Sequence, residues 1–481
     1  MAGRYHLSTI ITFFHYLLPY VCSQQIPTCV AISSFYTRIR ERKRAEERQK
    51  RIQEPIKKNF KNMELKRVVV TGIGAVSPVG NTAEETWENL LKGVSGAAPI
   101  TQFDATRYKT QFACEVKNFD ASKYIGRKEA RKMDKFCQLA LAGATMAIED
   151  SGMDLETINK DRVGVIYGVG IGGLKTMQDE LEYYSQHKDE PKFGPFFIPK
   201  MIGDIAPGHI SIKYGFHGPN YATTSACASS SNALADAFNL IRLGKADIIV
   251  SGGSEAVITD PGLGGFVSMH ALSTRNDEPQ KASRPFSKSR DGFVMGEGTA
   301  CLILEEYEHA KARGAKIYCE MVGAGMSADA HHITASHPEG LGAKIVMTEA
   351  LKDAEMKPED IDYINVHGTS TPVGDISEAK AIKDLFGDWA YKLNISSTKS
   401  MTGHLLGAAG ALEAMVCVLA VKNDIIPPTI NHEDGDEDEN IDYNMNFTFN
   451  TPQKREVRAA LSNTFGFGGH NACVIFKKYA E

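Results

Sequence analysis

Short β-branched runs alternate with longer helical stretches along most of this chain, and this alternation limits the fold more than any other feature. Runs typical of buried strands lie at residues 67–71, 163–167, 248–251, 301–305, 363–366, 393–396 and 473–476. Helical patterns lie between them, at residues 130–151, 228–243, 343–354 and 405–422. Alternation of this kind predicts an α/β architecture with mixed or parallel sheets.

A charged helical stretch that ends near Arg313 suggests a division of this region. The segment EEYEHAKARGAK is followed by a new apolar strand pattern, and strand–helix alternation continues on both sides of it. We therefore predict two halves, residues 63–313 and 314–481. Candidate catalytic residues fall in both, so the halves are expected to build one site together.

The first 62 residues differ in charge and pattern from the rest. They carry a net charge of +8, whereas residues 63–481 carry −13. The apolar run at residues 7–22 is interrupted by His15 and Pro19 and is too short to span a membrane as a helix. MELKRVVVTGIG, from Met63, opens a strand pattern at once. We predict that residues 1–62 are a disordered extension or a start-site artefact, and we expect no stable membrane insertion.

The acidic main body and the cysteine pattern exclude several classes of protein. A net charge of −13 argues against an enzyme that acts on nucleic acid. The nine cysteines contain no CxxC pair and no regular spacing, so neither a zinc site nor a disulfide framework is indicated. The adjacent His331 and His332 would point in different directions on an extended chain, and we predict no metal there. A cytoplasmic location is expected.

Cys227 is the first candidate for chemistry. It lies in YATTSACASSS, between a short extended run and an Ala/Asn/Leu-rich helical pattern. A sulfur at a helix N-terminus meets unpaired N–H groups and the helix dipole, which favour the thiolate. The small neighbours Ala226 and Ala228 leave room for a substrate carbonyl. On this local pattern alone, a nucleophile and a buried structural cysteine remain equal alternatives.

Two histidines strengthen the nucleophile hypothesis. His367 ends an apolar strand and opens the loop HGTSTPVGD, and strand ends of this kind commonly line sites in α/β proteins. His404 follows the loop SSTKSMTG and leads into a helix rich in Gly and Ala. Glu413 lies within that helix, where a carboxylate is costly to bury unless it is paired. Lys399, five residues before His404, is its candidate partner.

The segment SNTFGFGGHN near the C-terminus alternates Phe with Gly. This pattern predicts a constrained loop, just before the last strand, whose backbone approaches a ligand closely. Phe465 and Phe467 are either core residues or side chains that gate a pocket.

Four motifs in order, TTSAC, VHGTSTPVGD, KSMTGHLLGAAG and NTFGFGGHN, closely resemble those of the β-ketoacyl-[acyl-carrier-protein] synthases. The resemblance covers residues 63–481. A Cys-His-His set fits the elongating synthases, because the initiating ones carry Asn at the position of His404 and thiolases use a second Cys. The stretch SRPFSKSRDGFVMGEG resembles type II rather than type I elongating synthases.

This resemblance implies a thiolase-like fold, in which two similar halves form a five-layered αβαβα core, and a homodimer. It implies a cytoplasmic acyltransferase of fatty acid biosynthesis, a condensing enzyme that needs no metal or organic cofactor. Cys227 would take an acyl chain from acyl carrier protein. Malonyl-acyl carrier protein would then lose CO2, and its enolate would attack the acyl thioester.

The resemblance also implies roles for further residues. His367 and His404 would donate hydrogen bonds to the enolate, with Lys399 and Glu413 orienting them. The backbone N–H groups of Cys227 and Phe465 would form the oxyanion hole. Substrate-binding positions would be Ile171, which resembles the family's acyl-pocket residue, and Thr369, Thr371 and Phe467. The candidate carrier-protein docking residues are Lys128, Arg131 and Lys132.

Three other functions stay open at this point. A polyketide ketosynthase on the same fold would carry the same catalytic set and differ in substrate. A Cys-His thioester hydrolase or acyltransferase would pair a base with Cys227, but would have no use for a second enolate-stabilising histidine. A catalytically silent acyl-binding subunit is expected to have lost the cysteine that this chain retains.

Overall fold

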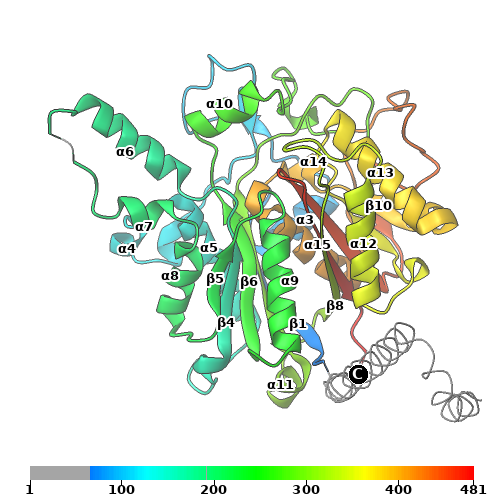
Figure 1. Cartoon of the computed structure of the whole chain (residues 1–481), viewed down its shortest axis with the longest axis horizontal. Helices are drawn as coiled ribbons and strands as arrows, with labels where there is room; N and C mark the ends of the chain where they lie inside the picture. Colours follow the sequence, from blue (N-terminus) through cyan, green and yellow to red (C-terminus); the bar gives the residue numbers. More distant parts are fainter. Residues whose placement is uncertain (1–64, 191, 481) are drawn as a thin grey trace, which may run out of the picture. The chain divides into compact units, whose positions relative to one another are not determined.

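The computed structural model describes residues 65–190 and 192–480, and every structural statement below refers to these residues (Figure 1). Ten strands form one continuous sheet in the order β10-β9-β13-β14-β8-β1-β7-β6-β4-β5. Strands from the first part of the chain occupy one side of this order, and strands from the second part occupy the other. The two sides meet where Val68–Val70 pairs antiparallel with Cys319–Met321.

The first side of the sheet is built from five strands. In sequence order they are β1 (Val68–Val76), β4 (Val163–Gly168), β5 (Asn220–Thr223), β6 (Ile248–Glu255) and β7 (Gly298–Glu306). Antiparallel pairing joins β1 to β7 and β7 to β6, whereas β6, β4 and β5 run parallel. The strand β4, between β6 and β5, is buried along its whole length, as its apolar sequence VGVIYG requires.

The second side repeats this plan. Its strands are β8 (Cys319–Ala328), β9 (Tyr363–Asn365), β10 (Asn394–Ser396), β13 (Ala459–Gly466) and β14 (His470–Lys477). β8 pairs antiparallel with β14, and β14 with β13, whereas β13, β9 and β10 run parallel. Strand order and direction are therefore the same in both halves, with β5 and β10 in equivalent outer positions.

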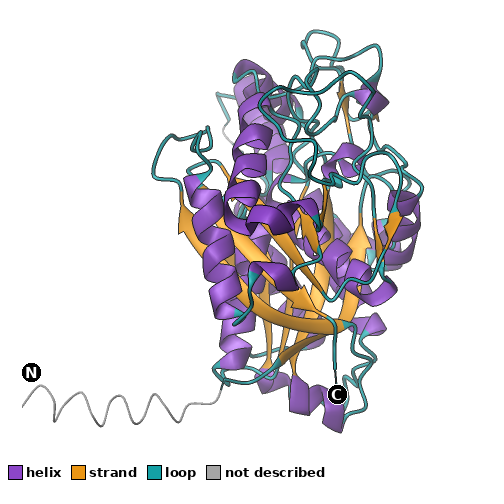
Figure 2. Ribbon diagram, turned by 90° about the vertical axis from the view of Figure 1, so that its right-hand side faces the viewer, coloured by secondary structure: helices purple, strands orange, loops and turns teal. Residues whose placement is uncertain are grey.

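Helices complete five layers. The helices α5 (Lys135–Asp150) and α8 (Ile205–Tyr214) pack on the outer face of the first half. The helices α9 (Ser229–Arg242) and α15 (Ala409–Asn423) pack against each other and against strands of both halves. The outer face of the second half carries α12 (Leu341–Asp353), beside α13 (Pro372–Phe386). Figure 2 shows helices on both sides of the strands. This arrangement confirms the predicted α/β, thiolase-like αβαβα fold.

The central helix α15 explains an unusual sequence. Its residues from Ala409 to Val421 are all buried, because strands of both halves and the helix α9 surround it. The segment 406–423 is the one described segment that is long and apolar enough to cross a membrane, yet 89% of it lies inside the protein. Its hydrophobicity is therefore accounted for by the core.

Shorter elements surround these layers. They are the helices α3 (Ala83–Leu91), α4 (Arg127–Ala130), α6 (Leu174–Gln186), α7 (Phe197–Met201), α10 (Asp260–Ser268), α11 (Tyr307–Ala312) and α14 (Lys399–Thr402), and the strand pairs β2 (Ala98–Pro99) with β3 (Phe112–Ala113) and β11 (Ile425–Ile426) with β12 (Gln453–Lys454). Much of α6 and α7 projects to the left of the main body in Figure 1.

The structure confirms each predicted strand within a few residues and corrects two other predictions. The helix expected at residues 130–151 starts only at Lys135, where Asp134 caps it, and residue 130 ends the separate helix α4. The constrained loop expected from Ser462 is mostly strand β13, followed by a tight turn at residues 467–469. Gly468 and Gly469 both have positive φ, which lets the chain reverse there.

Candidate active site

Loops from both halves line one cavity of about 520 Å³ at the carboxyl ends of the parallel strands. Cys227 enters it after β5, His367 after β9, and His404 from the segment that follows β10 and α14. The fold therefore brings together three candidates that lie up to 177 residues apart in the sequence. Ligands of open α/β folds commonly bind at this edge of the sheet.

A sharp turn presents Cys227 to the cavity. Ala226, the residue before it, has a φ of 50°, in a region that residues other than Gly rarely adopt. The helix α9 begins two residues later, at Ser229, as the sequence predicted. The side chain of Cys227 therefore lies at a helix N-terminus while the residue is only 8% exposed.

Burial changes the expected protonation of Cys227. It raises the pKa of the thiol to about 12, although the positive charge of Lys399 and the backbone N–H of Phe467 act in the opposite direction. Desolvation therefore opposes the thiolate that the helix N-terminus is predicted to favour. A neighbouring group that accepts the thiol proton would therefore assist the sulfur.

His404 is in position to accept that proton. Its Nε2 lies 3.0 Å from the Sγ of Cys227. Burial lowers the pKa of His404 well below its ordinary value, and the charge of Lys399 lowers it further. The imidazole is therefore neutral at physiological pH and can accept a proton at one nitrogen while it carries a hydrogen at the other.

His367 completes the group. Its ring lies 5.2 Å from that of His404, centroid to centroid, at an interplanar angle of 87°. Burial, then the charges of Lys399 and His404, hold its pKa well below the ordinary value. In each ring Nδ1 is buried without a hydrogen-bond partner among the described residues. Two neutral imidazoles in one cavity can donate hydrogen bonds to a developing oxyanion or enolate.

The structure places Lys399 against Glu413, the pairing that the sequence suggested. The Lys399 ammonium forms an ion pair with the Glu413 carboxylate, and both residues are buried. Burial raises the pKa of Glu413 to about 7, and the lysine charge limits that rise. This pair sets the electrostatic environment of the site, because Lys399 lowers the pKa of Cys227 and of both histidines.

Two buried carboxylates that the sequence analysis missed hold the loop that carries His367. Glu378 accepts the backbone N–H groups of His367 and Gly368, at 3.0 and 2.8 Å. Asp375 accepts that of Ser370 at 3.2 Å. From the sequence, acidic residues in the first turns of α13 would be assigned to an exposed helix face. Their burial in the structure shows that they hold the loop instead.

Aromatic side chains surround the three candidates. The ring of Phe293 meets that of His404 edge to face at 5.4 Å, and Phe465 lies 5.5 Å from His367. Phe467 lines the cavity and contacts Phe266. The amide that reaches Cys227 belongs to Phe467 rather than to Phe465, which lies within β13.

The predicted substrate-binding residues also line the cavity. The hydroxyls of Thr369 and Thr371 lie 3.0 Å apart on the loop after His367. Ile171 lies on the loop after β4, with 47% of its surface exposed.

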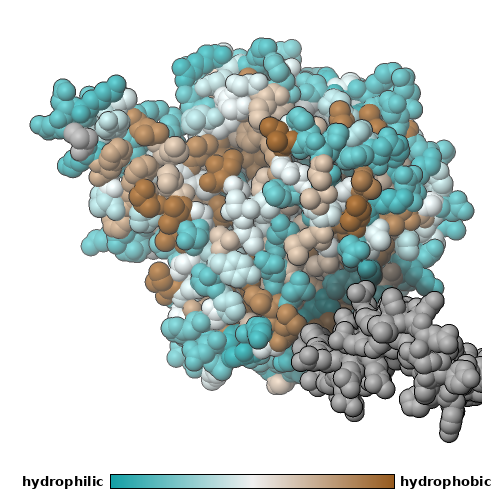
Figure 3. All heavy atoms as spheres, viewed as in Figure 1, coloured by the Kyte–Doolittle hydropathy of each residue, from teal (hydrophilic) through white to brown (hydrophobic). Residues whose placement is uncertain are grey.

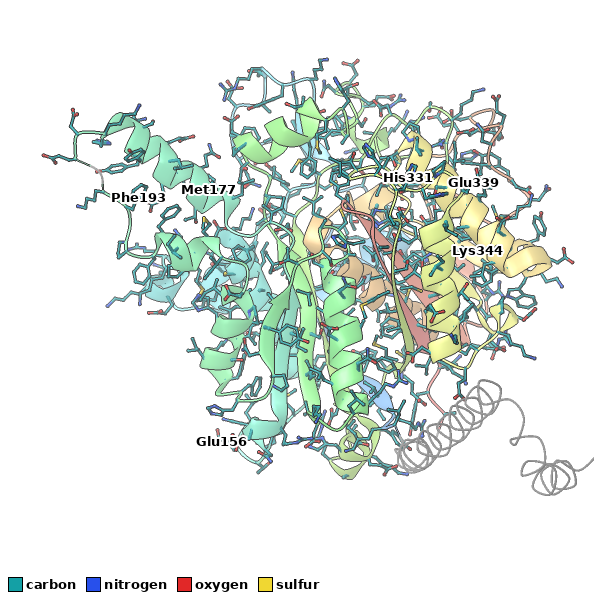
Figure 4. The ribbon with its side chains drawn as sticks, viewed as in Figure 1. Glu156, Met177, Phe193, His331, Glu339 and Lys344 are labelled. Carbon is teal, nitrogen blue, oxygen red and sulfur yellow. The ribbon has the colours of Figure 1, made fainter. Side chains whose placement is uncertain are left out.

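The remaining basic and histidine candidates lie away from the catalytic group. Lys128 is on α4 and exposed, and Arg131 and Lys132 follow it without lining the cavity. His331, labelled in Figure 4, meets the ring of His337 at 5.0 Å.

A repeated α/β fold with a buried thiol and two neutral histidines in one cavity defines the thiolase-like condensing enzymes. Family models match both halves: "Beta-ketoacyl synthase, N-terminal domain" matches residues 65–310, and "Beta-ketoacyl synthase, C-terminal domain" matches residues 318–433. The chain belongs to the β-ketoacyl synthase family, whose members are acyltransferases.

Relatives and solved structures agree with this assignment. A 3-oxoacyl-[acyl-carrier-protein] synthase 2 from Synechocystis sp. is 50% identical over 87% of this chain and 99% of the relative. The ishigamide ketosynthase/chain length factor has a TM-score of 0.81 and 33% identity. A ketosynthase of the AntDE:AntF type II polyketide complex has a TM-score of 0.77 and 32% identity. Both structures cover 86% of this chain and 100% of their own.

Proposed function

We propose that this protein is an elongating 3-oxoacyl-[acyl-carrier-protein] synthase of the second type. It joins a malonyl unit to an acyl chain held on Cys227, with loss of CO2, and so lengthens fatty acids. The observation that carries this proposal is the single cavity that holds Cys227, His404 and His367. The 50% identity to a relative of that name over nearly its whole length supports the same conclusion.

The first step is acyl transfer to Cys227. His404 Nε2, 3.0 Å from Sγ, accepts the thiol proton as the sulfur attacks the thioester carbonyl of the acyl carrier. The N–H groups of Cys227 and Phe467 stabilise the oxyanion; Phe467 replaces Phe465 in this role, because its N–H reaches the sulfur. The carrier thiolate leaves and takes up a proton, by way of solvent, from Nδ1 of the His404 imidazolium, so the acyl-enzyme remains with a neutral imidazole whose hydrogen is on Nε2.

The second step forms the carbon–carbon bond. The malonyl thioester enters beside Thr369 and Thr371, and its C–CO2 bond breaks to give CO2 and an enolate. The N–H groups of His367 and His404 stabilise the enolate oxygen as charge develops there. The enolate carbon attacks the acyl carbonyl and the bond to Sγ breaks. Cys227 then takes up the Nε2 proton of His404, and His404 Nδ1 regains a proton from solvent. Lys399 and Glu413 orient the histidines throughout.

Two alternatives compete with this proposal. The contact between Cys227 and His404 also suits a thioester hydrolase, but a hydrolase has no use for His367, a second neutral imidazole facing the first. A polyketide ketosynthase would use the same group. Sequence identity favours the fatty acid enzyme. This chain is 50% identical to the 3-oxoacyl-[acyl-carrier-protein] synthase 2, but only 32–33% identical to the polyketide-type structures.

The proposed protein partner is acyl carrier protein, which presents both substrates. A similar ketosynthase has been solved with its type II polyketide acyl-carrier protein, and this supports the proposal. Lys128, Arg131 and Lys132 are proposed to attract the acidic carrier, since charges at an interface rim mainly raise encounter rates.

We also propose a homodimer. Apolar side chains are exposed on the projecting α6–α7 region, on α8 and on β5, the last strand of the sheet order. Figure 3 shows apolar surface over the projecting region on the left, and Figure 4 labels Met177 and Phe193 there. A monomer rarely exposes so many large apolar side chains together. They are Met177, Leu181, Phe193, Phe196, Ile198, Ile202, Ile212 and Tyr221.

The remaining proposals concern organisation and location. Residues 63–313 and 314–481 are proposed as the two ketosynthase halves, and the repeated strand order supports this division. Residues 1–62 are proposed as an extension outside the catalytic fold; the predictions made for them lie outside the described residues. A cytoplasmic location is proposed, in keeping with the carrier-bound substrates.

The test is to incubate the protein with acyl-acyl carrier protein and then with malonyl-acyl carrier protein. We expect an acyl adduct on Cys227 by mass spectrometry, and then a 3-oxoacyl-carrier product and released CO2. Cys137→Ala is the matched control, because Cys137 is buried on α5 away from the cavity and its loss should leave the adduct intact. Release of free fatty acid in place of the 3-oxoacyl product would favour the hydrolase instead.

A further inference from the structure

Glu255 is a buried carboxylate that the mechanism above does not use. It is the last residue of β6, it is fully buried, and it lines the same cavity as Cys227. Burying a carboxylate costs free energy unless strong partners surround it. The partners of Glu255 therefore indicate its task.

Among the described residues, all the hydrogen bonds that Glu255 accepts come from backbone N–H groups. Three donors are consecutive on the loop after β4: Gly170 at 2.9 Å, Ile171 at 3.1 and 3.2 Å to the two oxygens, and Gly172 at 3.0 Å. The fourth donor is Gly407, at 3.2 Å, three residues after His404. One carboxylate thus joins the loop that carries the acyl-pocket residue Ile171 to the segment that carries a catalytic histidine.

The two segments are packed so closely that this link fixes their separation. A Cβ atom at Gly407 would collide with the backbone nitrogen of Gly170 and with the carboxylate itself. Leu406, which directs the Gly407 amide to the carboxylate, has a φ of 50°. A strained residue of this kind persists only where its surroundings hold it in place.

The partners also indicate the charge of Glu255. Burial raises its pKa to about 7, while the four N–H groups act in the opposite direction. A protonated carboxyl would turn an O–H toward surrounding N–H donors, so the arrangement fits the carboxylate. Its negative charge in turn raises the pKa of the Cys227 thiol.

We propose that Glu255 is a positioning residue that sets the acyl-chain specificity of this enzyme, by holding the Gly170–Gly172 loop against the His404 segment. The inference rests on the proposed function, because it assigns Ile171 to the wall of the acyl pocket. Losing the carboxylate would free both segments, move Ile171 and remove a negative charge near Cys227.

The test compares Glu255→Gln with the native protein in two measurements. The first is kcat/KM for acyl-carrier substrates from hexanoyl to hexadecanoyl. Gln offers one carbonyl oxygen and turns an NH2 group toward the other N–H donors, so the loop is displaced. We expect the ratio of long-chain to short-chain kcat/KM to change about tenfold, the effect of losing one charged hydrogen bond. An unchanged ratio would overturn the proposal.

The second measurement is the pH dependence of Cys227 alkylation by iodoacetamide. Removing a negative charge favours the thiolate, so the midpoint in Glu255→Gln should move to lower pH. Glu305→Gln is the matched control. Glu305 is equally buried and charged, but it pairs with Arg313 and does not line the cavity. This variant should lose stability yet keep the native chain-length ratio and alkylation midpoint; a shift in either one equal to that of Glu255→Gln would overturn the proposal.

If Glu255→Gln does not fold, Glu255→Asp replaces it in both measurements. It retains the charge but shortens the side chain, so the alkylation midpoint should stay native while the chain-length ratio changes; a native ratio would contradict the proposal. Failure of the native protein to elongate any acyl carrier would refute the proposed function. Alkylation needs no substrate, so it would still show whether Glu255 acts on Cys227.

Discussion

The two halves of this protein share one strand plan but supply different chemistry. The third strand of the first half, β5, leads to Cys227 and the central helix α9. The third strand of the second half, β10, leads to His404 and the central helix α15. Equivalent positions thus carry the nucleophile in one half and its histidine partner in the other. The scaffold fixes where the side chains meet, and the residue at each position decides the chemistry.

The loops after the second strand of each half show a similar relation. The loop after β4 carries Ile171 and is held by Glu255, whereas the loop after β9 carries His367 and is held by Glu378. Both glutamates are buried and accept backbone N–H groups, but one ends a strand and the other lies on a helix. The requirement for a fixed loop is common to both halves, while the means of fixing it differs.

The largest effect is expected when the first half loses its nucleophile. Cys227→Ala should abolish the acyl adduct and lower condensation at least about 1000-fold, because no other group can hold the chain. Decarboxylation of malonyl-acyl carrier protein should persist, since the histidines of the second half remain. Adduct mass and CO2 release measure the two activities. An adduct that persists in Cys227→Ala would place the nucleophile elsewhere.

The next largest effect is expected when the second half loses one of its histidines. His404→Ala should lower malonyl decarboxylation about 100- to 1000-fold, because one donor to the enolate is lost. Acylation of Cys227 should fall by no more than about tenfold, because Lys399, the Phe467 N–H and the helix N-terminus still favour the thiolate without His404. Single-turnover acylation and CO2 release separate the two. Loss of acylation with decarboxylation spared would refute this division between the halves.

A third variant tests how the second half controls charge in the first. Lys399→Met should destabilise the fold by about 3–5 kcal/mol, because Glu413 is left buried without its partner. It should also raise the pKa values of His367 and His404, which the lysine charge now lowers. Denaturant unfolding and the pH profile of decarboxylation measure these changes. The control, Lys399→Met with Glu413→Gln, should recover most of the stability but not the native pH profile.

The smallest expected effect is on the stability of the protein at acidic pH. The two histidines have folded pKa values well below their ordinary value of 6.5. Below pH 6.5, these histidines bind protons in the unfolded chain but stay neutral in the folded protein. The free energy of unfolding should therefore fall by up to about 1.4 kcal/mol per pH unit for each histidine. His404→Asn should reduce this acid loss, as measured by unfolding at neutral and mildly acidic pH. Equal losses in both proteins would mean that His404 is not buried as a neutral ring.

Much of the fold could be predicted because buried strands and helices leave periodic apolar patterns. The strands β4, β6 and β7 are apolar runs of this kind, and each is present. The short strand β5 is half exposed and β8 is rich in Gly and Met, so the sequence shows only a short extended run before Cys227 and an apolar strand pattern after Arg313, without bounds. The sequence predicts a loop where most of strand β13 lies, because the Phe–Gly alternation continues from the strand into the turn.

The sequence by itself determined the α/β class, the candidates Cys227, His367 and His404, and the resemblance to β-ketoacyl synthases, because these depend on local pattern and motif. Only the tertiary structure decided that Cys227 is buried beside His404, that the backbone N–H of Phe467 acts on the thiol, and that Glu255 and Glu378 hold the loops. The physical reason is that desolvation and hydrogen bonding depend on which distant segments meet. Neither leaves a mark in the spacing of residues along the chain.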